Sequence, residues 1–120
     1  MSRYFKEVEE NMDIEFLALL DIARESAAIP FVINSAFRDP IKNKAVGGKP
    51  NSSHLKGLAV DIRATNSRTR HTVLKALIET GFTRIGVAGT FIHVENKNIR
   101  KIVILILNYL KYYIVLMVLV

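Results

Sequence analysis

Three side chains of types that bind metals stand out in the sequence. His54 and Asp61 lie seven residues apart, and His93 follows in the apolar run of residues 91–95. Two imidazoles and one carboxylate form the ligand set of a catalytic zinc site, in which the fourth position is left to water. A zinc ion held by neutral His54, ionised Asp61 and neutral His93 keeps a net positive charge, which activates water and polarises a carbonyl group. The residue types therefore predict a zinc centre suited to hydrolysis.

Glu95 is the candidate proton acceptor for such a hydrolysis. The attacking water needs a base that takes its proton and passes it to the leaving amine. His93 and Glu95 are two residues apart, and side chains with this spacing on a strand project from the same face. Glu95 is therefore the predicted catalytic residue.

The element that must position the first two candidate ligands is a strand with the loop before it. Residues 58–62 form a short apolar run, which predicts a buried strand that carries Asp61. His54 lies on the loop that enters this strand. The intervening Gly57 allows a tight backbone turn, so that both side chains can face one point.

The remaining pattern predicts a small α+β domain. The expected elements are an amphipathic helix over residues 12–24 with Asp13 as N-cap and Pro30 beyond its end, a strand over 31–35, a polar loop over 36–53, a helix capped by Ser67 and ended by Gly81, and a hairpin of residues 84–87 and 91–95. We therefore expect a small antiparallel sheet with flanking helices.

The composition limits the classes of protein and partner. The 120 residues suffice for one small domain, which we expect to be a monomer. No cysteine is present, so disulfides and thiolate metal sites are excluded. The net charge is +6, but the basic residues are scattered and no nucleic-acid-binding motif occurs. We therefore expect no nucleic-acid partner.

Several segments resemble one family of zinc peptidases. Residues 52–61 follow the order Ser-x-His-x-x-Gly-x-Ala-x-Asp, which resembles the zinc peptidases of the D-alanyl-D-alanine carboxypeptidase type. These enzymes cut bacterial cell-wall peptides. The resemblance covers roughly residues 4–95 and looks most like the short single-domain branch of phages and bacterial genomes, the peptidase M15-type C-terminal domain. It implies a hedgehog-like, D-Ala-D-Ala-peptidase-like fold. It is carried also by residues 33–38, 43–52, 81–87 and 91–95.

The resemblance implies zinc as the cofactor, with His54, Asp61 and His93 as its ligands, and a peptidoglycan stem peptide as the substrate. It also implies that Arg38 binds the carboxylate of the substrate, because a planar guanidinium can form two parallel hydrogen bonds with it. Ser52 would donate a hydrogen bond near the bound peptide.

Plainer interpretations of these two substrate-binding residues stay open. In the alternative interpretation, Arg38 instead forms an ordinary loop salt bridge with Asp39 or Asp61. Ser52 is also typical of a turn.

Two positions depart from the family pattern. Several relatives carry an acidic base three residues before the second zinc histidine, where this chain has Thr90. The short branch usually has aspartate two residues after that histidine, where this chain has Glu95. The resemblance implies a zinc metallopeptidase, a D,D-carboxypeptidase or endopeptidase, with a phage or prophage lytic role. The alternative is a non-catalytic zinc-bearing module that binds wall peptides, or a degenerate peptidase.

The last part of the sequence differs from the rest, so we expect a zinc peptidase domain over residues 1–101 and an apolar tail over residues 102–120. The tail is about long enough to cross a hydrocarbon core of ~30 Å, although Lys111 lies near its middle. It is expected to be a membrane anchor, a final strand and buried helix, or a frameshifted end. The N-terminus has no secretory signal pattern, so we expect a cytoplasmic protein that is membrane-associated if the tail is an anchor.

Overall fold

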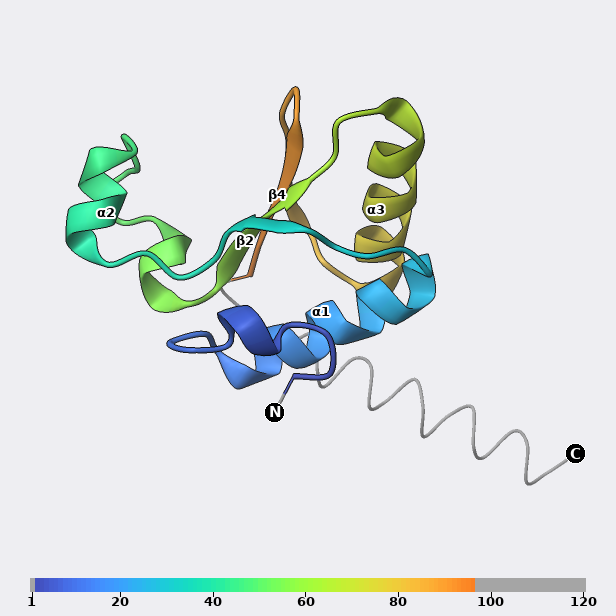
Figure 1. Cartoon of the computed structure of the whole chain (residues 1–120), viewed down its shortest axis with the longest axis horizontal. Helices are drawn as coiled ribbons and strands as arrows, with labels where there is room; N and C mark the ends of the chain where they lie inside the picture. Colours follow the sequence, from blue (N-terminus) through green and yellow to red (C-terminus); the bar gives the residue numbers. More distant parts are fainter. Residues whose placement is uncertain (1, 97–120) are drawn as a thin grey trace, which may run out of the picture.

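The computed structural model describes residues 2–96, which form one four-stranded antiparallel sheet with helices packed against it (Figure 1). The strand order is β1-β2-β4-β3. The predicted α+β class is therefore confirmed. The elements, in chain order, are η1 (Lys6–Val8), α1 (Ile14–Ala27), β1 (Ile33–Ser35), α2 (Pro40–Ala45), η2 (Ser53–Lys56), β2 (Ala59–Arg63), α3 (Ser67–Thr80), β3 (Arg84–Val87) and β4 (Phe91–Glu95).

The two faces of the sheet differ, because side chains alternate along the central strands β2 and β4. Val60 and Ile62 of β2, with Ile92 and Val94 of β4, are fully buried in the core. The residues between them, such as Asp61, therefore project from the opposite face. One face is thus covered by helices, and the other is left for polar side chains.

Helices α1 and α3 pack against each other and against the apolar face of the sheet (Figure 1). Phe16 and Leu20 of α1 and Val73 and Leu77 of α3 are completely buried. The ring of Phe16 meets that of Phe82 edge to face, with centroids 5.8 Å apart. Full burial of one such side chain contributes about 1.5–3 kcal/mol, so this layer holds the sheet in place.

The ends of the two long helices follow the predicted capping with two corrections. The Asp13 side chain accepts a hydrogen bond from the Phe16 amide and caps α1, as predicted. However, α1 continues to Ala27, past the expected end at residue 24, and its C-cap Ala28 is in the left-handed conformation (φ 57°). The N-cap of α3 is Asn66 rather than Ser67, because the Asn66 side chain accepts from Thr69 N. Gly81 ends α3 in the left-handed region, as predicted.

The prediction of one polar loop over residues 36–53 is wrong, because this segment contains the short helix α2 and leads into η2. The Asp39 carboxylate caps α2 by accepting from Lys42 N at 2.8 Å, and Pro40 occupies the first turn. Both features are typical of a helix start.

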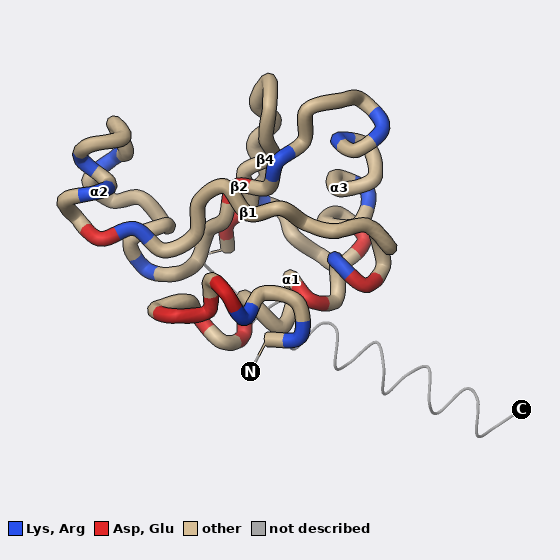
Figure 2. The backbone as a smooth tube through the Cα atoms, viewed as in Figure 1, with Lys and Arg blue, Asp and Glu red and all other residues tan. Residues whose placement is uncertain are grey.

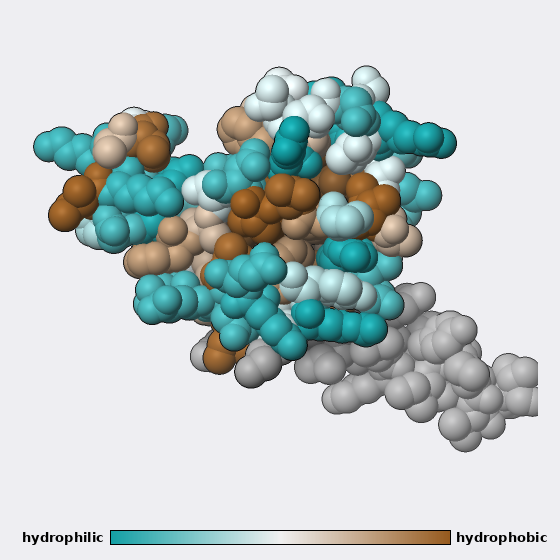
Figure 3. All heavy atoms as spheres, in the orientation of Figure 1, coloured by the Kyte–Doolittle hydropathy of each residue, from teal (hydrophilic) through white to brown (hydrophobic). Residues whose placement is uncertain are grey.

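Helix α2 projects from the body of the molecule on the side of η2 (Figure 1). Its lysines contrast with the acidic residues of the N-terminal segment (Figure 2). Exposed apolar side chains also lie on this projection (Figure 3), since Ile41 and Val46 are both largely exposed.

The expected boundary at residue 101 and the apolar segment 102–120 lie outside the described residues. Within residues 2–96, no helix is both long enough and apolar enough to cross a membrane.

Candidate metal centre

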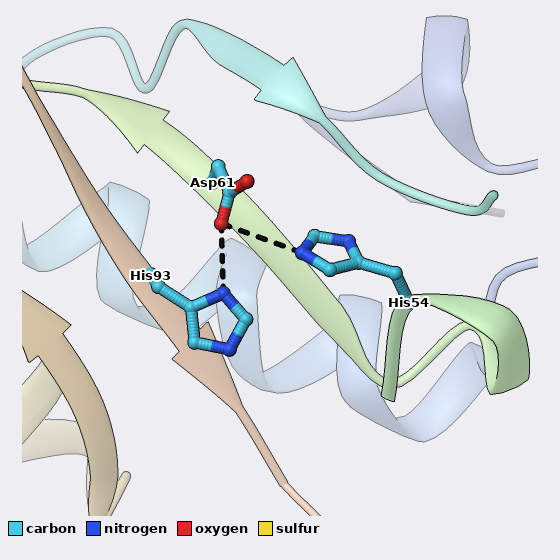
Figure 4. Close-up of side chains that lie close together, drawn as sticks. All are labelled: His54, Asp61 and His93. Atoms are coloured by element: carbon cyan, nitrogen blue, oxygen red, sulfur yellow. Dashed lines mark hydrogen bonds and ion pairs between the residues drawn. The ribbon is translucent and has the colours of Figure 1, made fainter. Parts of the chain in front are cut away.

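Strand register brings two of the three candidate ligands face to face. In the antiparallel pair β2–β4, Asp61 lies directly opposite His93, so their side chains share the polar face of the sheet. His54 comes from η2, the turn that leads into β2 (Figure 4). The structure thus brings together three residues that are spread over forty positions of the sequence.

The carboxylate of Asp61 lies between the two imidazoles (Figure 4). Its Oδ1 is 2.7 Å from Nδ1 of His93 and 3.4 Å from Nε2 of His54. One donor atom from each of the three residues lies within 4.8 Å of the other two. Such a convergence of two ring nitrogens and one carboxylate oxygen can hold a metal ion.

The ring of His54 is oriented by the backbone. Its Nδ1 lies 2.7 Å from the carbonyl oxygen of Ala36, and a carbonyl can only accept, so Nδ1 carries the proton. Nε2, which faces Asp61, is therefore the nitrogen left to bind a metal ion. The side chain is almost fully buried, which holds this orientation.

Gly57 makes the turn that places His54. It ends η2 in the left-handed region with φ 68°, and its amide is bonded to the His54 carbonyl. A Cβ atom at this position would lie 2.3 Å from the Asn11 carbonyl oxygen. Glycine is therefore needed for both conformation and space, in agreement with the predicted tight turn.

Glu95 contacts the far edge of the His93 ring. Its Oε1 is 3.1 Å from Nε2 of His93, whereas Asp61 is at Nδ1. The other carboxylate oxygen accepts a 2.5 Å hydrogen bond from the Ser53 hydroxyl and lies 3.5 Å from Nε of Arg84. Glu95 is thus beside the three-residue group rather than a member of it, and its predicted role as base stays a prediction.

Arg38 forms an ion pair with Asp61, one of the two partners named in its plainer interpretation. Its Nη2 is 3.2 Å from Oδ2 of Asp61, and its Nε donates to Ser35 Oγ at 3.0 Å. The alternative partner Asp39 instead caps α2. Arg38 also lines the cleft described below, and its predicted contact with substrate stays a prediction.

Ser52 occupies the turn position that was its plainer interpretation. Its hydroxyl oxygen accepts a hydrogen bond from the His54 amide at 3.2 Å and caps η2. The residue also borders the cleft. Its predicted hydrogen bond to a substrate is not tested by these contacts.

The contacts within the group shift the acid–base balance of its members. Burial of Asp61 acts to raise its pKa, but the hydrogen bonds from His54 and His93 outweigh burial and hold this pKa well below its usual range. The hydrogen bond to Asp61 raises the pKa of His93, against the opposing effect of burial. For Glu95, burial acts to raise the pKa, and the hydrogen bonds from Ser53 and His93 lower it overall. Both carboxylates are therefore ionised at neutral pH.

The group opens into a cleft of about 670 Å³, large enough for a short peptide. Its wall is formed by the β2–β4 face, by η2 and by the loop after α2. Asp61 and Glu95 are the carboxylates of this lining, and its cationic side chains are Arg38, Lys49 and Arg84.

Comparison with known proteins identifies the family of this chain. The model of the peptidase M15 family matches residues 1–95. The chain belongs to this family. The peptidase M15 match confirms the resemblance predicted from residues 52–61. No curated protein sequence matches the chain.

A solved structure shares the fold of this M15 family member. The L-Ala D-Glu endopeptidase ChiX of Serratia marcescens superposes with a TM-score of 0.54, covering 79% of this chain and 87% of that chain. The sequence identity is 16%, so the likeness is one of fold. It confirms the small antiparallel sheet with flanking helices.

The donor set of this M15 family member fits a divalent cation that accepts nitrogen and oxygen ligands, such as zinc. The other ring nitrogen of His54, Nδ1, donates a hydrogen bond to the Ala36 carbonyl, as the second nitrogen of metal-binding histidines generally does. The carboxylate supplies the negative charge that compensates a cation. Without a cation, the 2.7 Å contact between His93 and Asp61 needs a proton, which a metal ion would displace.

Sequence reasoning missed two residues that hold this site. Ser53 and Arg84 both contact Glu95. Arg84 lies opposite Glu95 in the β3–β4 hairpin, so cross-strand pairing in the predicted hairpin was a signal for it. Ser53 is 42 residues from Glu95, and no sequence pattern connects them.

Proposed function

We propose that this M15 peptidase is a zinc-dependent hydrolase of peptidoglycan stem peptides, acting as a D,D-carboxypeptidase or an endopeptidase. The observation that carries the proposal is the convergence of His54, Asp61 and His93 in the lining of a peptide-sized cleft. Family membership supports the peptidase activity. The fold shared with an L-Ala D-Glu endopeptidase supports a wall peptide as substrate.

His54, Asp61 and His93 would hold the zinc ion through Nε2, a carboxylate oxygen and a ring nitrogen. When bound, zinc supplies a positive charge that activates water and polarises the scissile carbonyl. The protein's own contribution is to fix these donors in advance. Ala36 orients the ring of His54, and Arg38 orients the carboxylate of Asp61.

The cationic residues of the cleft suit a substrate that carries carboxylates. Arg38 and Arg84 already pair with Asp61 and Glu95, and Lys49 lies on the loop after α2 that lines the cleft. A stem peptide has a free C-terminal carboxylate and further acidic groups. We propose that Arg38 binds one of these carboxylates, since a guanidinium has five donors and can keep Asp61 as a second partner. Ser52 would donate a hydrogen bond to the peptide.

Two roles are open to Glu95: it is either the catalytic base or a residue that orients His93. Glu95 is the second carboxylate of the cleft and is ionised, as a base must be. However, its two oxygens already accept hydrogen bonds from His93 and Ser53. These contacts favour a role in orienting His93, and they give substance to the alternative of a zinc-bearing module that binds wall peptide without cleaving it.

The test is zinc content and turnover measured on one preparation of the full chain. Purified muropeptides are the substrate, and mass spectrometry distinguishes release of D-Ala from cleavage between L-Ala and D-Glu. His54→Ala is the inactivating variant. The matched control is His71→Ala, since His71 is exposed on α3 and outside the cleft.

We expect one zinc per chain and a cleaved peptide bond, with both lost in His54→Ala and retained in His71→Ala. Zinc binding without cleavage of any muropeptide would favour the non-catalytic module. Absence of zinc from the wild-type protein would overturn the proposal.

A further inference from the structure

A chain of hydrogen bonds links two segments that are far apart in the sequence. The hydroxyl of Ser53 donates to Oε2 of Glu95 at 2.5 Å, and Oε1 of Glu95 lies 3.1 Å from Nε2 of His93. Ser53 stands at the start of η2, and Glu95 and His93 stand on β4. The Ser53–Glu95–His93 chain therefore connects the turn that carries His54 to the strand that carries the second histidine.

Ser53 is held rigidly at its place. Its side chain is buried, with 5% of the residue exposed. Its carbonyl oxygen accepts from Leu58 N at 3.1 Å, so the backbone of Ser53 is tied to the residue just before β2. A hydroxyl on such a scaffold can fix the carboxylate that it contacts.

Of the two groups that contact Oε2 of Glu95, Ser53 is the stronger constraint. A short hydrogen bond from a hydroxyl to an ionised carboxylate is among the stronger kinds in proteins. Arg84 is 3.5 Å from the same oxygen, but more than half of its side chain is exposed. Water and salt screen an ion pair of this kind. The position of the Glu95 carboxylate therefore depends mainly on Ser53.

The position of Glu95 decides which nitrogen of His93 is available to a metal. A neutral imidazole has one N–H and one lone pair, and the hydrogen bond made by one nitrogen sets the role of the other. A carboxylate at Nε2 holds the proton there, because an ionised carboxylate only accepts. When a metal ion displaces the proton shared by Nδ1 and Asp61, the lone pair is left on Nδ1, the nitrogen that faces Asp61 at 2.7 Å.

We propose that Ser53 is a positioning residue of the metal centre: it holds Glu95 against Nε2 of His93, so that His93 offers Nδ1 to the metal ion. This inference rests on the proposed function, because it assumes that His93 is a ligand. It adds a residue that acts on the metal centre through Glu95. Partners of this kind generally change metal affinity about 10- to 100-fold when they are removed.

The experiment compares zinc affinity and the state of the His93 ring in four forms of the full chain. These are wild type, Ser53→Ala, Glu95→Ala and the double variant. Zinc affinity is measured by competition with a chromophoric chelator. The ring nitrogens of His93 are observed by ¹⁵N NMR in the zinc-loaded protein, which identifies the nitrogen bound to the metal. Ser26→Ala, an exposed serine of α1, is the matched control.

In the wild type we expect zinc on Nδ1 of His93 and a proton on Nε2. Ser53→Ala should weaken zinc binding about tenfold and give a mixed signal from the His93 ring, whereas Ser26→Ala should change neither. Because Ser53 acts through Glu95, Ser53→Ala should add less than about twofold to the effect of Glu95→Ala.

Three results would overturn the inference alone. These are zinc on Nε2 of His93 in the wild type, unchanged zinc affinity in Ser53→Ala, and additive effects in the double variant. The first of these needs no variant, so it decides the matter even if Ser53→Ala folds poorly. Failure of the wild type to bind zinc would instead overturn the proposed function, and this inference with it.

Discussion

Arg38 and Asp61, 23 residues apart in the sequence, form an ion pair in which Nη2 lies 3.2 Å from Oδ2. Both side chains are largely buried. Because Arg38 takes Oδ2, the other oxygen of Asp61 is turned toward the two histidines. Arg38 therefore fixes which carboxylate oxygen faces the metal centre, whatever else it binds.

Replacement of Arg38 should affect the metal centre before any substrate is added. In Arg38→Ala, the buried Asp61 carboxylate loses its guanidinium, which costs about 3–5 kcal/mol when one partner of a buried pair is removed. We expect a lower melting temperature and about 10- to 100-fold weaker zinc binding. Arg38→Lys keeps the positive charge but lacks the planar guanidinium. Its melting temperature and zinc affinity should lie between those of the wild type and Arg38→Ala.

Separate measurement of zinc affinity and KM distinguishes the two roles of Arg38. A rise in KM at saturating zinc indicates that the guanidinium also binds the substrate carboxylate. Unchanged zinc affinity in Arg38→Ala would contradict the orienting role that its contact with Asp61 implies.

Gly57→Ala should disturb the turn that carries His54. The left-handed conformation costs an alanine roughly 1–2 kcal/mol, and a Cβ atom would lie 2.3 Å from the Asn11 carbonyl oxygen. We expect a loss of stability well above this conformational cost, together with loss of zinc binding. Denaturant unfolding and zinc titration measure the two effects.

Gly47→Ala separates conformation from crowding in that experiment. Gly47 also has a positive φ, 75°, but a Cβ atom there would meet nothing within 4 Å. It should therefore show the conformational cost alone. Equal destabilisation by the two substitutions would show that the contact with the Asn11 backbone is unimportant.

Gly48→Ala should loosen the wall of the cleft. Its Cβ atom would lie 2.0 Å from Oδ1 of Asn43, and the Asn43 amide holds the Lys49 carbonyl at 2.9 Å. Asn43 must rotate and give up this hydrogen bond, at a cost of about 1–3 kcal/mol. We expect a raised KM with nearly unchanged zinc affinity, because the loop lines the cleft but supplies no candidate ligand.

Gly89→Ala, in the turn of the β3–β4 hairpin, is the matched control for Gly48→Ala. Gly89 has an ordinary φ and open space around its Cβ position, so Gly89→Ala should change stability by less than about 0.5 kcal/mol. If Gly48→Ala leaves KM at the wild-type value, Asn43 does not control this wall.

Local patterns in the sequence predicted most of the fold. Capping by Asp13, the left-handed Gly81 and the β3–β4 hairpin follow from nearby residues, and the structure confirms all three. Helix α2 was missed although Asp39 and Pro40 are helix-start signals, because six residues are too few to show an apolar period.

Residues of the site could be predicted only where side chains of metal-binding types lie within short sequence motifs. His54 and Asp61 lie within one short motif, and the structure brings His93 to them through the β2–β4 register. Their role as zinc ligands remains a prediction. Ser53 could not be identified, since its partner Glu95 is 42 residues away and only tertiary packing makes them neighbours.

The stability of the metal-free protein should depend on pH with opposite signs in acid and in base. The hydrogen bond to Asp61 raises the pKa of His93, so its stabilising effect is fully present below the ordinary value near 6.5. This effect is lost as the pH rises through the raised value. Hydrogen bonds from the histidines outweigh burial and lower the pKa of Asp61, so its contribution is present above about 3.9 and lost in stronger acid.

We therefore expect the melting temperature of chelator-treated protein to be highest between about pH 4 and 6.5 and to fall on the alkaline side. His93→Gln should remove the alkaline fall, because glutamine does not titrate. Zinc affinity should change in the opposite sense and rise with pH, since the metal must displace the proton shared by His93 and Asp61. A melting temperature that is flat from pH 6 to 9 in both proteins would show that this proton does not stabilise the metal-free site. A zinc affinity independent of pH over the same range would show that His93 binds no metal.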